Sequence, residues 1–403
     1  MNILAINAGS SSLKYGLINM KNEIIVAKGS CDKIGSKESF FSYVTSAFRK
    51  TKLKIEIKNH KEAIGEIVRI LSDKKVGVVT SLEKIAAIGH RIAHGGVFFD
   101  KSIIINSDVI EKIDSVSHLA PLHNKMQIET IRACQEILGK SKKEVAVFDT
   151  AFHSSMNPSA FMFSIPYKYY KKYKIRRYGF HGLSHKFVCE KCAKMMNKDV
   201  KTLKLISCHL GSGSSIASVK NFKVVDTSMG FTPLDGLIMS TRSGAIDPSI
   251  ITFLQKEEGL SSKEVENILN KQSGFLGVSG ISSDVRDVKK AANEGHEKSI
   301  LACNILKHQI IKLIGAYVAL MNGCDAIIFT AGIGENYWKL REEIFENFKY
   351  LGIEIDKKLN KTTVERKQGV ISTKNSKIAV FVIPTNEELM IAREAQKTIL
   401  NEA

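Results

Sequence analysis

The sequence predicts an α/β fold built from two similar halves. Apolar runs typical of strands, such as Ile85–Gly89, alternate with helical patterns such as His60–Leu71 through the first third of the chain. An apolar strand, a Gly/Ser-rich turn and further strands occur at the N-terminus and again from Leu203 onward. The alternation predicts largely parallel sheets, and the repetition predicts a duplicated fold.

The first Gly/Ser-rich turn has the composition of a phosphate-binding site. The strand Ile3–Ile6 runs directly into the small-residue turn Asn7–Lys14. Gly9 lets backbone N–H groups approach an anion, the serines add donors, and Lys14 adds a positive charge. A P-loop requires a helix after its lysine, whereas the residues up to Ile24–Val26 read as strands. This strand–turn–strand pattern points to the actin-like architecture of ATPases and kinases.

The second turn repeats the first near half the chain length. The strand Leu203–Ser207 meets the turn His209–Ser215, and strands at Ile216–Val219 and Phe222–Val225 follow. We therefore expect an α/β fold of the duplicated actin-like (ribonuclease H-like) type, with two domains and an interdomain active-site cleft. The expected boundaries are 1–149 plus 387–403 for the N-terminal domain with its closing helix, and 150–386 for the nucleotide domain.

The remaining elements follow from periodicity. A helical pattern is read at Ser39–Ala47, and a strand is expected at Val145–Phe148. The segment Ile246–Ala319 is expected to be mostly helical. A third glycine turn, Thr330–Asn336, follows a strand and precedes a helix that begins near Trp338. The strand Ala379–Ile383 leads to a short closing helix, which Thr385 or Asn386 can cap.

Length and composition are those of an ordinary globular protein. The chain has 403 residues, 44% hydrophobic and 25% charged, enough for about two to three domains. No apolar run approaches the roughly 18 residues of a membrane span, and the N-terminus lacks a signal-peptide pattern. These features, together with an odd number of scattered cysteines, predict a cytoplasmic protein with no membrane partner.

The formal charge of +18 leaves a nucleic-acid partner open, but the basic residues are scattered and form no stripe. We interpret them as a solvated surface that attracts anionic substrates, and we expect no nucleic-acid partner.

Cys189 and Cys192 form a lone CxxC pair without a second pair of zinc ligands. They are expected to be neighbours on one helix face.

Polar side chains of a phosphoryl-transfer type stand where apolar strands end, as in the sites of α/β sheets. Each one also has an ordinary structural explanation, such as a helix cap, a turn residue or a carbonyl partner. Together they supply arginines for a carboxylate and a phosphoryl group, histidine donors, and oxygen ligands for Mg²⁺. These residues are Asn7, Arg91, His123, Asp149, His181, His209, Arg242 and Glu387.

The chain resembles the acetate kinase family of the actin-like superfamily, which also includes propionate and butyrate kinases. The resemblance covers nearly the whole length and rests on many separate motifs in one order. The motifs are Asn7–Lys14, Gly89–Gly96, Ala120–Asn124, Val147–His153, Arg176–Gly182, Asp226–Gly236, Ser283–Arg286, Gly332–Asn336 and Pro384–Leu389.

This resemblance implies a role for each matched residue. The catalytic residues would be Asp149, His181 and Arg242. The acyl substrate would contact Arg91, Ala93, Leu122, His123, Phe180 and Pro233. The Mg²⁺ site, in which Mn²⁺ is an alternative, would use Asn7 and Glu387. ATP would contact Ser10, Ser12, Lys14, His209, Leu210, Gly211, Ser212, Gly213, Asp284, Val285, Arg286, Gly332, Ile333, Gly334, Glu335 and Asn336.

The implied reaction is reversible Mg²⁺-dependent phosphoryl transfer between ATP and acetate, giving acetyl phosphate and ADP, with a homodimer as the expected assembly. A carboxylate is already a nucleophile at pH 7, so catalysis reduces to alignment and charge neutralisation. We therefore interpret Asp149 as an orienting and metal-organising group rather than an obligatory base.

Three residues depart from the family pattern. Ser212 stands where Asn is usual, Ser240 where Gly is usual, and Ala245 where Asp is usual. Ser212 reaches less far than Asn, which predicts weaker nucleotide binding. Ser240 and Ala245 flank Arg242 and are expected to hold it more loosely. The retained catalytic residues predict that activity survives.

Three alternatives accompany this interpretation. Ala93 replaces the Val that is common in acetate-preferring members and leaves room for one more methylene, worth about 1–3 kcal/mol, so a propionate kinase is the first. The other two are a non-catalytic ATP-binding regulator and an Hsp70-like ATPase. A chaperone would be expected to carry a β-rich peptide-binding domain as well.

Overall fold

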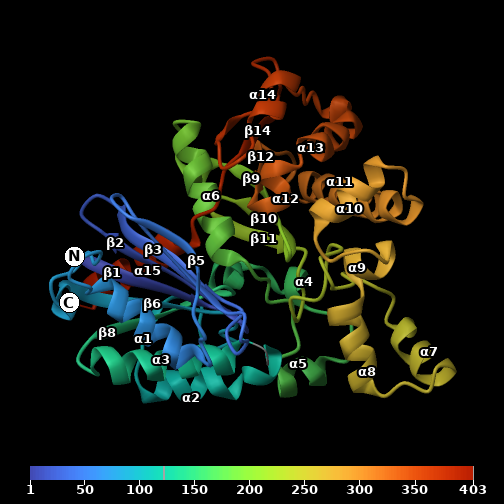
Figure 1. Cartoon of the computed structure of the whole chain (residues 1–403). Coiled ribbons are helices and arrows are strands. Elements are labelled where there is room, and N and C mark those ends of the chain that lie inside the picture. The colour runs from blue at the N-terminus through green and yellow to red at the C-terminus, as the bar shows by residue number, and fades with distance from the viewer. Residues whose placement is uncertain (121–122, 403) are drawn as a thin grey trace. The chain divides into compact units, whose positions relative to one another are not determined.

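The computed structural model describes residues 1–120 and 123–402 and divides into two compact units (Figure 1). Unit 1 comprises Met1–Phe152 and Asn386–Ala403, and unit 2 comprises His153–Thr385. Among the described residues, no helix combines the length and the apolar character needed to cross a membrane.

The described residues of unit 1 form a mixed sheet and four α-helices. Its strands are β1 (Asn2–Ala8), β2 (Ser12–Asn19), β3 (Ile24–Asp32), β4 (Phe40–Thr45), β5 (Arg49–Lys54), β6 (Ile85–Ile92), β7 (Ile103–Ile104) and β8 (Lys143–Phe148). Its helices are α1 (His60–Leu71), α2 (Ser107–Ser115), α3 (Asn124–Leu138) and α15 (Glu387–Asn401). The eight-stranded sheet has the order β5-β4-β3-β2-β1-β6-β8-β7.

The first predicted hairpin is confirmed. β1 and β2 pair antiparallel, with Asn7 opposite Lys14, and β1 pairs parallel with β6 on its other side. Every residue of β1 from Ile3 to Ala8 is buried, as expected for the central strand of a sheet covered on both faces. The turn between the two strands therefore emerges from the middle of the sheet.

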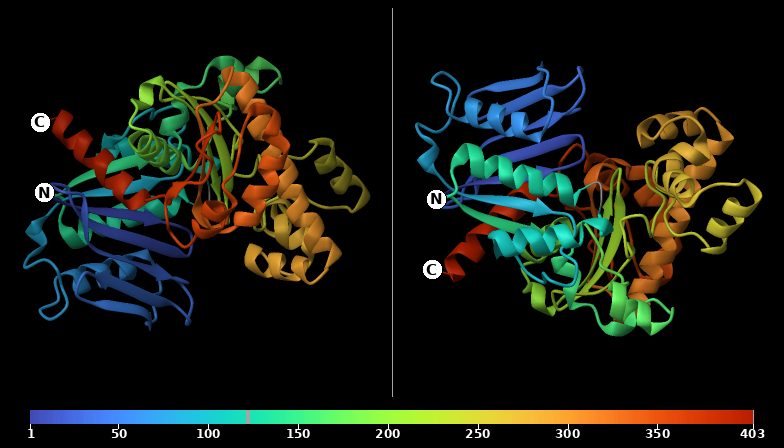
Figure 2. Two further views of the ribbon diagram at one scale, coloured as in Figure 1. Left: turned by 90° about the horizontal axis from the view of Figure 1, so that it is seen from above. Right: turned by 90° about the horizontal axis from the view of Figure 1, so that it is seen from below.

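Helices cover both faces of this sheet. α15 packs on β1, β6 and β8, while α3 packs on β1 and β6 from the other face (Figure 2). α15 lies directly on β6, because a Cβ at Gly89 would come within 2.6 Å of the Ile391 side chain. Alternate residues of β6 thus face different helices, with Gly89 and Arg91 toward α15 and Ile88 and His90 toward α3.

Two expectations for unit 1 are wrong. The segment Ser39–Ala47 contains the strand β4 instead of a helix, because Phe41 and Tyr43, two positions apart, share one sheet face and are buried in the core there. The sheet is mixed rather than largely parallel. Strands β1 to β5 follow one another through short connections, and such strands must pair antiparallel.

Unit 2 has a second mixed sheet. Its strands are β9 (Lys204–Leu210), β10 (Ser214–Lys220), β11 (Lys223–Thr227), β12 (Ala326–Thr330), β13 (Gly369–Val370) and β14 (Ala379–Val382), in the order β11-β10-β9-β12-β14-β13. Its helices are α4 (Pro158–Phe161), α5 (Tyr167–Tyr173), α6 (Gly182–Met195), α7 (Ser249–Glu257), α8 (Ser262–Asn267), α9 (Gly274–Ser279), α10 (Val285–Asn293), α11 (Glu297–Met321), α12 (Ala331–Asn336), α13 (Trp338–Phe345) and α14 (Lys357–Thr362).

The second hairpin repeats the arrangement of the first. β9 pairs antiparallel with β10, with Leu210 opposite Ser214, and parallel with β12 on its other side. Helices α6 and α11 pack on this sheet, and α11 buries residues spaced three to four apart, including Leu306, Ile310 and Ile314. The predicted helical middle of the chain is confirmed by α7 to α11. Cys189 and Cys192 both lie buried on α6, as expected.

Candidate functional site

Four polar side chains meet at one end of the unit 1 sheet. Asn7 lies near the end of β1, Arg91 near the end of β6, Asp149 directly after β8, and Glu387 at the first turn of α15. β1, β6 and β8 run parallel, so their carboxyl ends share one sheet edge. The topology therefore brings together residues that are far apart in the sequence.

Arg91 is the centre of this cluster. Its Nε and Nη2 both donate to Oδ2 of Asp149, at 3.1 and 2.5 Å, and its Nη1 donates to Oδ1 of Asn7 at 2.9 Å. Nδ2 of Asn7 in turn donates to Oε2 of Glu387 at 3.0 Å. These bonds fix the orientation of the amide, because its oxygen faces a cation and its nitrogen faces an anion.

The electrostatics favour a charged arginine at this position. Burial disfavours the guanidinium charge, but the Asp149 carboxylate outweighs it and, with smaller contributions from Glu387 and Glu388, holds the pKa of Arg91 above its usual value. Asp149 is 2% exposed, whereas the Arg91 side chain is 18% exposed. The Arg91 side chain is therefore partly exposed, while the Asp149 side chain is enclosed.

The donor set of this cluster fits a hard divalent cation. The side chains of Asn7, Asp149 and Glu387 supply one amide and two carboxylate groups, the oxygen ligands that Mg²⁺ prefers. Asn386 caps α15 by accepting from the N–H of Leu389 at 3.1 Å, so Glu387 stands in the first helical turn. A carboxylate is stabilised there by the helix dipole. In this arrangement the Asn7 oxygen also accepts from Arg91.

A buried glutamine that the sequence reasoning missed supports the same sheet edge. Gln127 on α3 is 1% exposed, accepts from the N–H of Ala93 at 2.9 Å and donates to the carbonyl of Ala8 at 3.1 Å. It thereby joins the ends of β1 and β6. The available signal was a polar residue on the apolar face of a helix, where an unpaired amide would be costly.

In unit 2, the turn after β9 lies beside two of the predicted catalytic residues. The N–H of Gly211 donates to the carbonyl of Gly213 at 3.1 Å and to Oγ of Ser214 at 3.3 Å, which closes the turn. A Cβ at Gly213 would lie 2.7 Å from Nη2 of Arg242 and 3.2 Å from Nε2 of His181. Only glycine therefore lets this turn, the guanidinium and the imidazole approach so closely.

Histidines and buried serines form a network behind this turn. Oγ of Ser215 lies 2.9 Å from Nδ1 of His181 and 2.8 Å from Nε2 of His185. Oγ of Ser184 lies 2.8 Å from Nδ1 of His209, whose ring stacks on that of His181 with centroids 4.1 Å apart. Burial, followed by the nearby histidines, holds the pKa of His185 well below its usual value, so its ring is neutral at pH 7.

The serines of this network were missed as site residues. Ser184, Ser207 and Ser215 are each 0% exposed, and Oγ of Ser207 lies 2.8 Å from Nδ1 of His185. Their signal in the sequence was a hydroxyl in an otherwise apolar strand or helix, and Ser184 alone stands next to a histidine. Such a hydroxyl can donate to one ring nitrogen and accept from another, so it fixes the ring tautomer.

Arg242 is held from the other side by a backbone carbonyl. Its Nη1 donates to the carbonyl of Pro233 at 2.6 Å, and burial lowers the pKa of its guanidinium. The flanking Ser240 donates its N–H to the carbonyl of Ser212 at 3.1 Å, which ties the arginine loop to the glycine turn. Ala245 is exposed, and its N–H donates to the carbonyl of Gly236 at 2.9 Å.

The third glycine turn is held by a buried arginine. Gly332–Asn336 lies in α12, and Arg341 donates to the carbonyls of Gly334 and Glu335, both at 2.7 Å. Arg341 also donates to Oδ1 of Asn360 at 2.8 Å and is 1% exposed. Burial lowers the pKa of Arg341 to about 10, so it remains charged at pH 7. The carbonyl oxygens of this turn therefore stabilise the positive charge of Arg341.

A family model described as the acetokinase family matches residues 2–393 of the chain. The chain belongs to the acetokinase family. The chain is 50% identical over 400 residues to an acetate kinase of Caldanaerobacter subterraneus subsp. tengcongensis, covering 99% of each protein. Two solved structures match it closely. An acetate kinase of Porphyromonas gingivalis has a TM-score of 0.92 at 39% identity, covering 99% of both chains. A propionate kinase of Francisella tularensis subsp. tularensis has a TM-score of 0.90 at 42% identity, covering 98% of this chain and 99% of the other.

These matches and the two mixed sheets confirm the predicted duplicated actin-like fold of this acetokinase family member.

The other predicted site residues differ in their burial and position. Lys14 is exposed and opposite Asn7, while Phe180 is buried against Met229 and Met239. His123 immediately precedes α3, and Leu122 lies outside the described residues.

The predicted nucleotide residues on α10 also have a defined arrangement. Asp284 caps the helix by accepting from the N–H of Arg286 at 2.8 Å, and it pairs with the Arg286 guanidinium. These hydrogen bonds lower the pKa of the Asp284 carboxyl. The Arg286 side chain is 90% exposed, so it is open to an anionic ligand.

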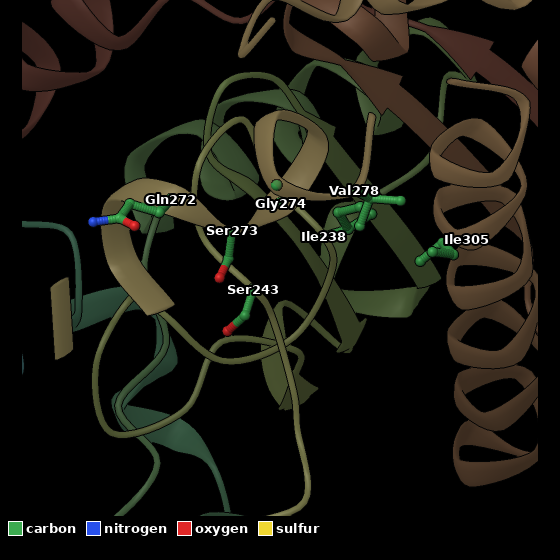
Figure 3. A pocket seen from close by; sticks show the side chains of 8 residues that line it. Ile238, Ser243, Gln272, Ser273, Gly274, Val278 and Ile305 are labelled. Carbon is green, nitrogen blue, oxygen red and sulfur yellow. The ribbon is translucent and has the colours of Figure 1, made fainter. Parts of the chain in front are cut away.

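A pocket of about 350 Å³ lies in unit 2 beside the Arg242 loop (Figure 3). It is lined by apolar side chains, including Ile238, Val278 and Ile305, and by polar ones, including Ser243 and Gln272. None of the described residues predicted for catalysis or binding lines it. Ser243 follows Arg242 directly in sequence, so the pocket lies behind the loop that carries this arginine.

Proposed function

We propose that this member of the acetokinase family is an acetate kinase, which transfers the γ-phosphoryl group of ATP reversibly to acetate. A carboxylate oxygen of acetate forms a bond to the γ-phosphorus while the bond to the ADP oxygen breaks, and ADP leaves with the electron pair. The products are acetyl phosphate and ADP. The observation that carries this proposal is Arg91, whose charged and partly exposed side chain is held by Asn7 and Asp149 in a chain of this family.

Arg91 is proposed to bind the acetate carboxylate. Two of its nitrogens are committed to Asp149 and one to Asn7, so its plane is fixed before substrate arrives. Fixing a reactant in this way removes part of the entropic barrier of a two-substrate reaction. Because acetate is ionised at pH 7, Asp149 serves to orient Arg91 and the metal site rather than to remove a proton.

His181 and Arg242 are proposed to stabilise the transferring phosphoryl group. His185 is neutral, and if its Nε2–H donates to Ser215, the Ser215 hydroxyl donates to Nδ1 of His181. In that tautomer Nε2 of His181 carries the proton and faces the same space as the Arg242 guanidinium. Donors aimed at a group that gains charge in the transition state lower the barrier more than donors to the ground state.

The proposed metal site is formed by Asn7 and Glu387 with Asp149 beside them, and Mg²⁺, with Mn²⁺ as an alternative, fits their oxygen donors. When bound, the cation would neutralise charge on the ATP phosphates. The residues Lys14, Ser10 and Ser12 of the first turn are proposed to contact those phosphates. The remaining predicted ATP contacts are proposed at His209–Gly213, Asp284–Arg286 and Gly332–Asn336.

Acetate is proposed as the preferred acid. The relatives at about 50% identity carry the name acetate kinase, whereas the propionate kinase of known structure is 42% identical. The propionate alternative drawn from Ala93 is therefore not favoured, although Ala93 itself is buried at the sheet edge. The regulator and the Hsp70-like alternatives are set aside for the same reason. A homodimer and a cytoplasmic location remain proposals.

The test is a hydroxamate assay for acyl phosphate with ATP, Mg²⁺ and acetate, propionate or butyrate in turn. The proposal expects product with acetate at the highest kcat/KM and loss of product when the metal is omitted. The variant Ala93→Val is expected to lower kcat/KM for propionate more than for acetate, because it fills the space of the extra methylene. Absence of acyl phosphate with every acid would overturn the proposal.

A further inference from the structure

A second cluster of chemically reactive side chains lies under α3, on the face of the unit 1 sheet that Arg91 does not use. It consists of His90 on β6, Glu144 on β8 and Cys134 on α3. One ligand atom of each residue lies within 4.8 Å of those of the other two. The three residues are 2%, 3% and 0% exposed, respectively.

The polar atoms of this cluster are incompletely satisfied. Nε2 of His90 and Oε1 of Glu144 lie 3.5 Å apart, and neither has a hydrogen-bond partner among the residues that the structure describes. The other carboxylate oxygen, Oε2, accepts from Nε2 of Gln135 at 3.0 Å. A buried polar atom without a partner costs about 1–3 kcal/mol, so two that face one another require an explanation.

The donor atoms suit a particular class of cation. An imidazole nitrogen, a thiol sulfur and a carboxylate oxygen together match Zn²⁺ and related borderline-soft ions, whereas Mg²⁺ prefers oxygen ligands alone. Bonds of about 2.0–2.3 Å in a tetrahedron place the donors roughly 3.3–3.7 Å apart. The separation of 3.5 Å between His90 and Glu144 already fits, and the Cys134 sulfur needs to move by at most about 1.5 Å.

We propose that His90, Cys134 and Glu144 form a buried three-ligand site for a divalent cation of the Zn²⁺ class. The ion would fill the space between the two unpartnered atoms and bind the Cys134 thiolate. It would link α3 to β6 and β8, so its binding free energy would add to the stability of unit 1. The site is separate from the proposed Mg²⁺ ligands in both its residues and its donor chemistry.

The thiol must lose its proton to bind. Burial, and next the Glu144 carboxylate, hold the pKa of Cys134 well above its usual value in the metal-free protein. Binding at neutral pH would therefore release a proton and weaken as the pH falls. The competing explanation is a protonated His90 paired with Glu144, which needs no metal. The two explanations differ in whether Cys134 takes part.

The test uses the untagged full-length protein, treated with a chelator and then kept in excess Mg²⁺ so that oxygen-only sites are filled. Zn²⁺ is added and counted by mass spectrometry after dialysis. Co²⁺ is added in a parallel sample, because a thiolate ligand gives Co²⁺ an absorption band in the near ultraviolet. The variants are Cys134→Ser and Glu144→Gln, and the matched control is Cys192→Ser, another buried cysteine outside the cluster.

The wild type and Cys192→Ser are expected to hold one Zn²⁺ per chain, to show the cobalt–thiolate band and to gain Tm with Zn²⁺. Cys134→Ser should lose the band, and both cluster variants should bind Zn²⁺ more than about tenfold more weakly. If Cys134→Ser does not fold, the Zn²⁺ affinity of Glu144→Gln alone tests the proposal. Wild-type protein that holds no Zn²⁺, or cluster variants that bind as tightly as wild type, would overturn the site and favour the proton-linked pair.

Discussion

Replacing Asp149 by Asn tests how Arg91 is held. The substitution keeps the shape of the side chain but removes the negative charge that receives two N–H bonds from Arg91, at 3.1 and 2.5 Å. Both bonds go to the single atom Oδ2, so the oxygen of an Asn in the same place can still receive them, but only as a neutral acceptor. The guanidinium would retain Asn7 at 2.9 Å but lose the ion pair that fixes its plane.

The size of the effect follows from the burial of the pair. Breaking a fully buried ion pair by removing one partner costs about 3–5 kcal/mol. The Arg91 side chain is 18% exposed and keeps Asn7 and Glu387 nearby, so we reduce this to about 2–4 kcal/mol. If this free energy is lost from transition-state binding because Arg91 is misplaced, kcat/KM for acetate falls by about 30- to 1,000-fold.

The assay is steady-state acyl phosphate formation as a function of acetate concentration and pH. Both KM for acetate and kcat should change, while the shape of the pH profile between about pH 6 and 8 should not, because acetate is ionised throughout. Asp108→Asn is the matched control, since it removes an exposed Asp–Lys pair and should leave the kinetics unchanged. Activity of Asp149→Asn within threefold of wild type, or a new pH dependence in this range, would refute the orienting role.

Three further predictions concern unit 2. Gly213→Ala should lower kcat by more than about tenfold, because the added Cβ would displace Arg242 and His181. Circular dichroism should show little loss of secondary structure. Wild-type kinetics would argue against the proposed roles of Arg242 and His181. Protonation of His185 is resisted in the folded state, so the free energy of unfolding should fall as the pH drops below about 6.5. Urea unfolding at several pH values measures that slope, and His185→Gln should reduce it; an unchanged slope would contradict the assignment. Arg341→Met should destabilise the protein in urea by about 1–3 kcal/mol for each carbonyl left without a partner and should raise KM for ATP. Stability equal to wild type would show that these carbonyl contacts contribute little.

The parts of the site that depend on local sequence could be predicted. The turn Asn7–Lys14 could be recognised because a central strand is uniformly apolar and glycine and serine mark its end. Arg91 and Asp149 could be selected because they stand at the ends of apolar strands, and parallel strands end at one sheet edge. Glu387 could be selected because it opens the helix after the last apolar strand. Their bonds to one another depend on tertiary packing, which local sequence does not record.

The errors have the same physical origin. Phe40–Thr45 carries apolar residues at a spacing that also suits a helix, and only pairing with β3 and the burial of Phe41 and Tyr43 favour the strand. Gln127, Ser184 and Ser215 could not be identified as supporting residues, because a polar residue in an apolar element has the same appearance whether or not its partner is functional. Their partners lie on elements distant in the sequence.

The most direct test of the proposed function is a phosphorus NMR time course of the purified protein with ATP, Mg²⁺ and acetate. The account predicts that the γ-phosphate signal of ATP is replaced by acetyl phosphate and ADP in equal amounts, and that acetyl phosphate with ADP regenerates ATP. Arg91→Ala should slow both directions. Release of inorganic phosphate at a rate independent of acetate, with no acetyl phosphate signal in either direction, would contradict the assignment as an acetate kinase.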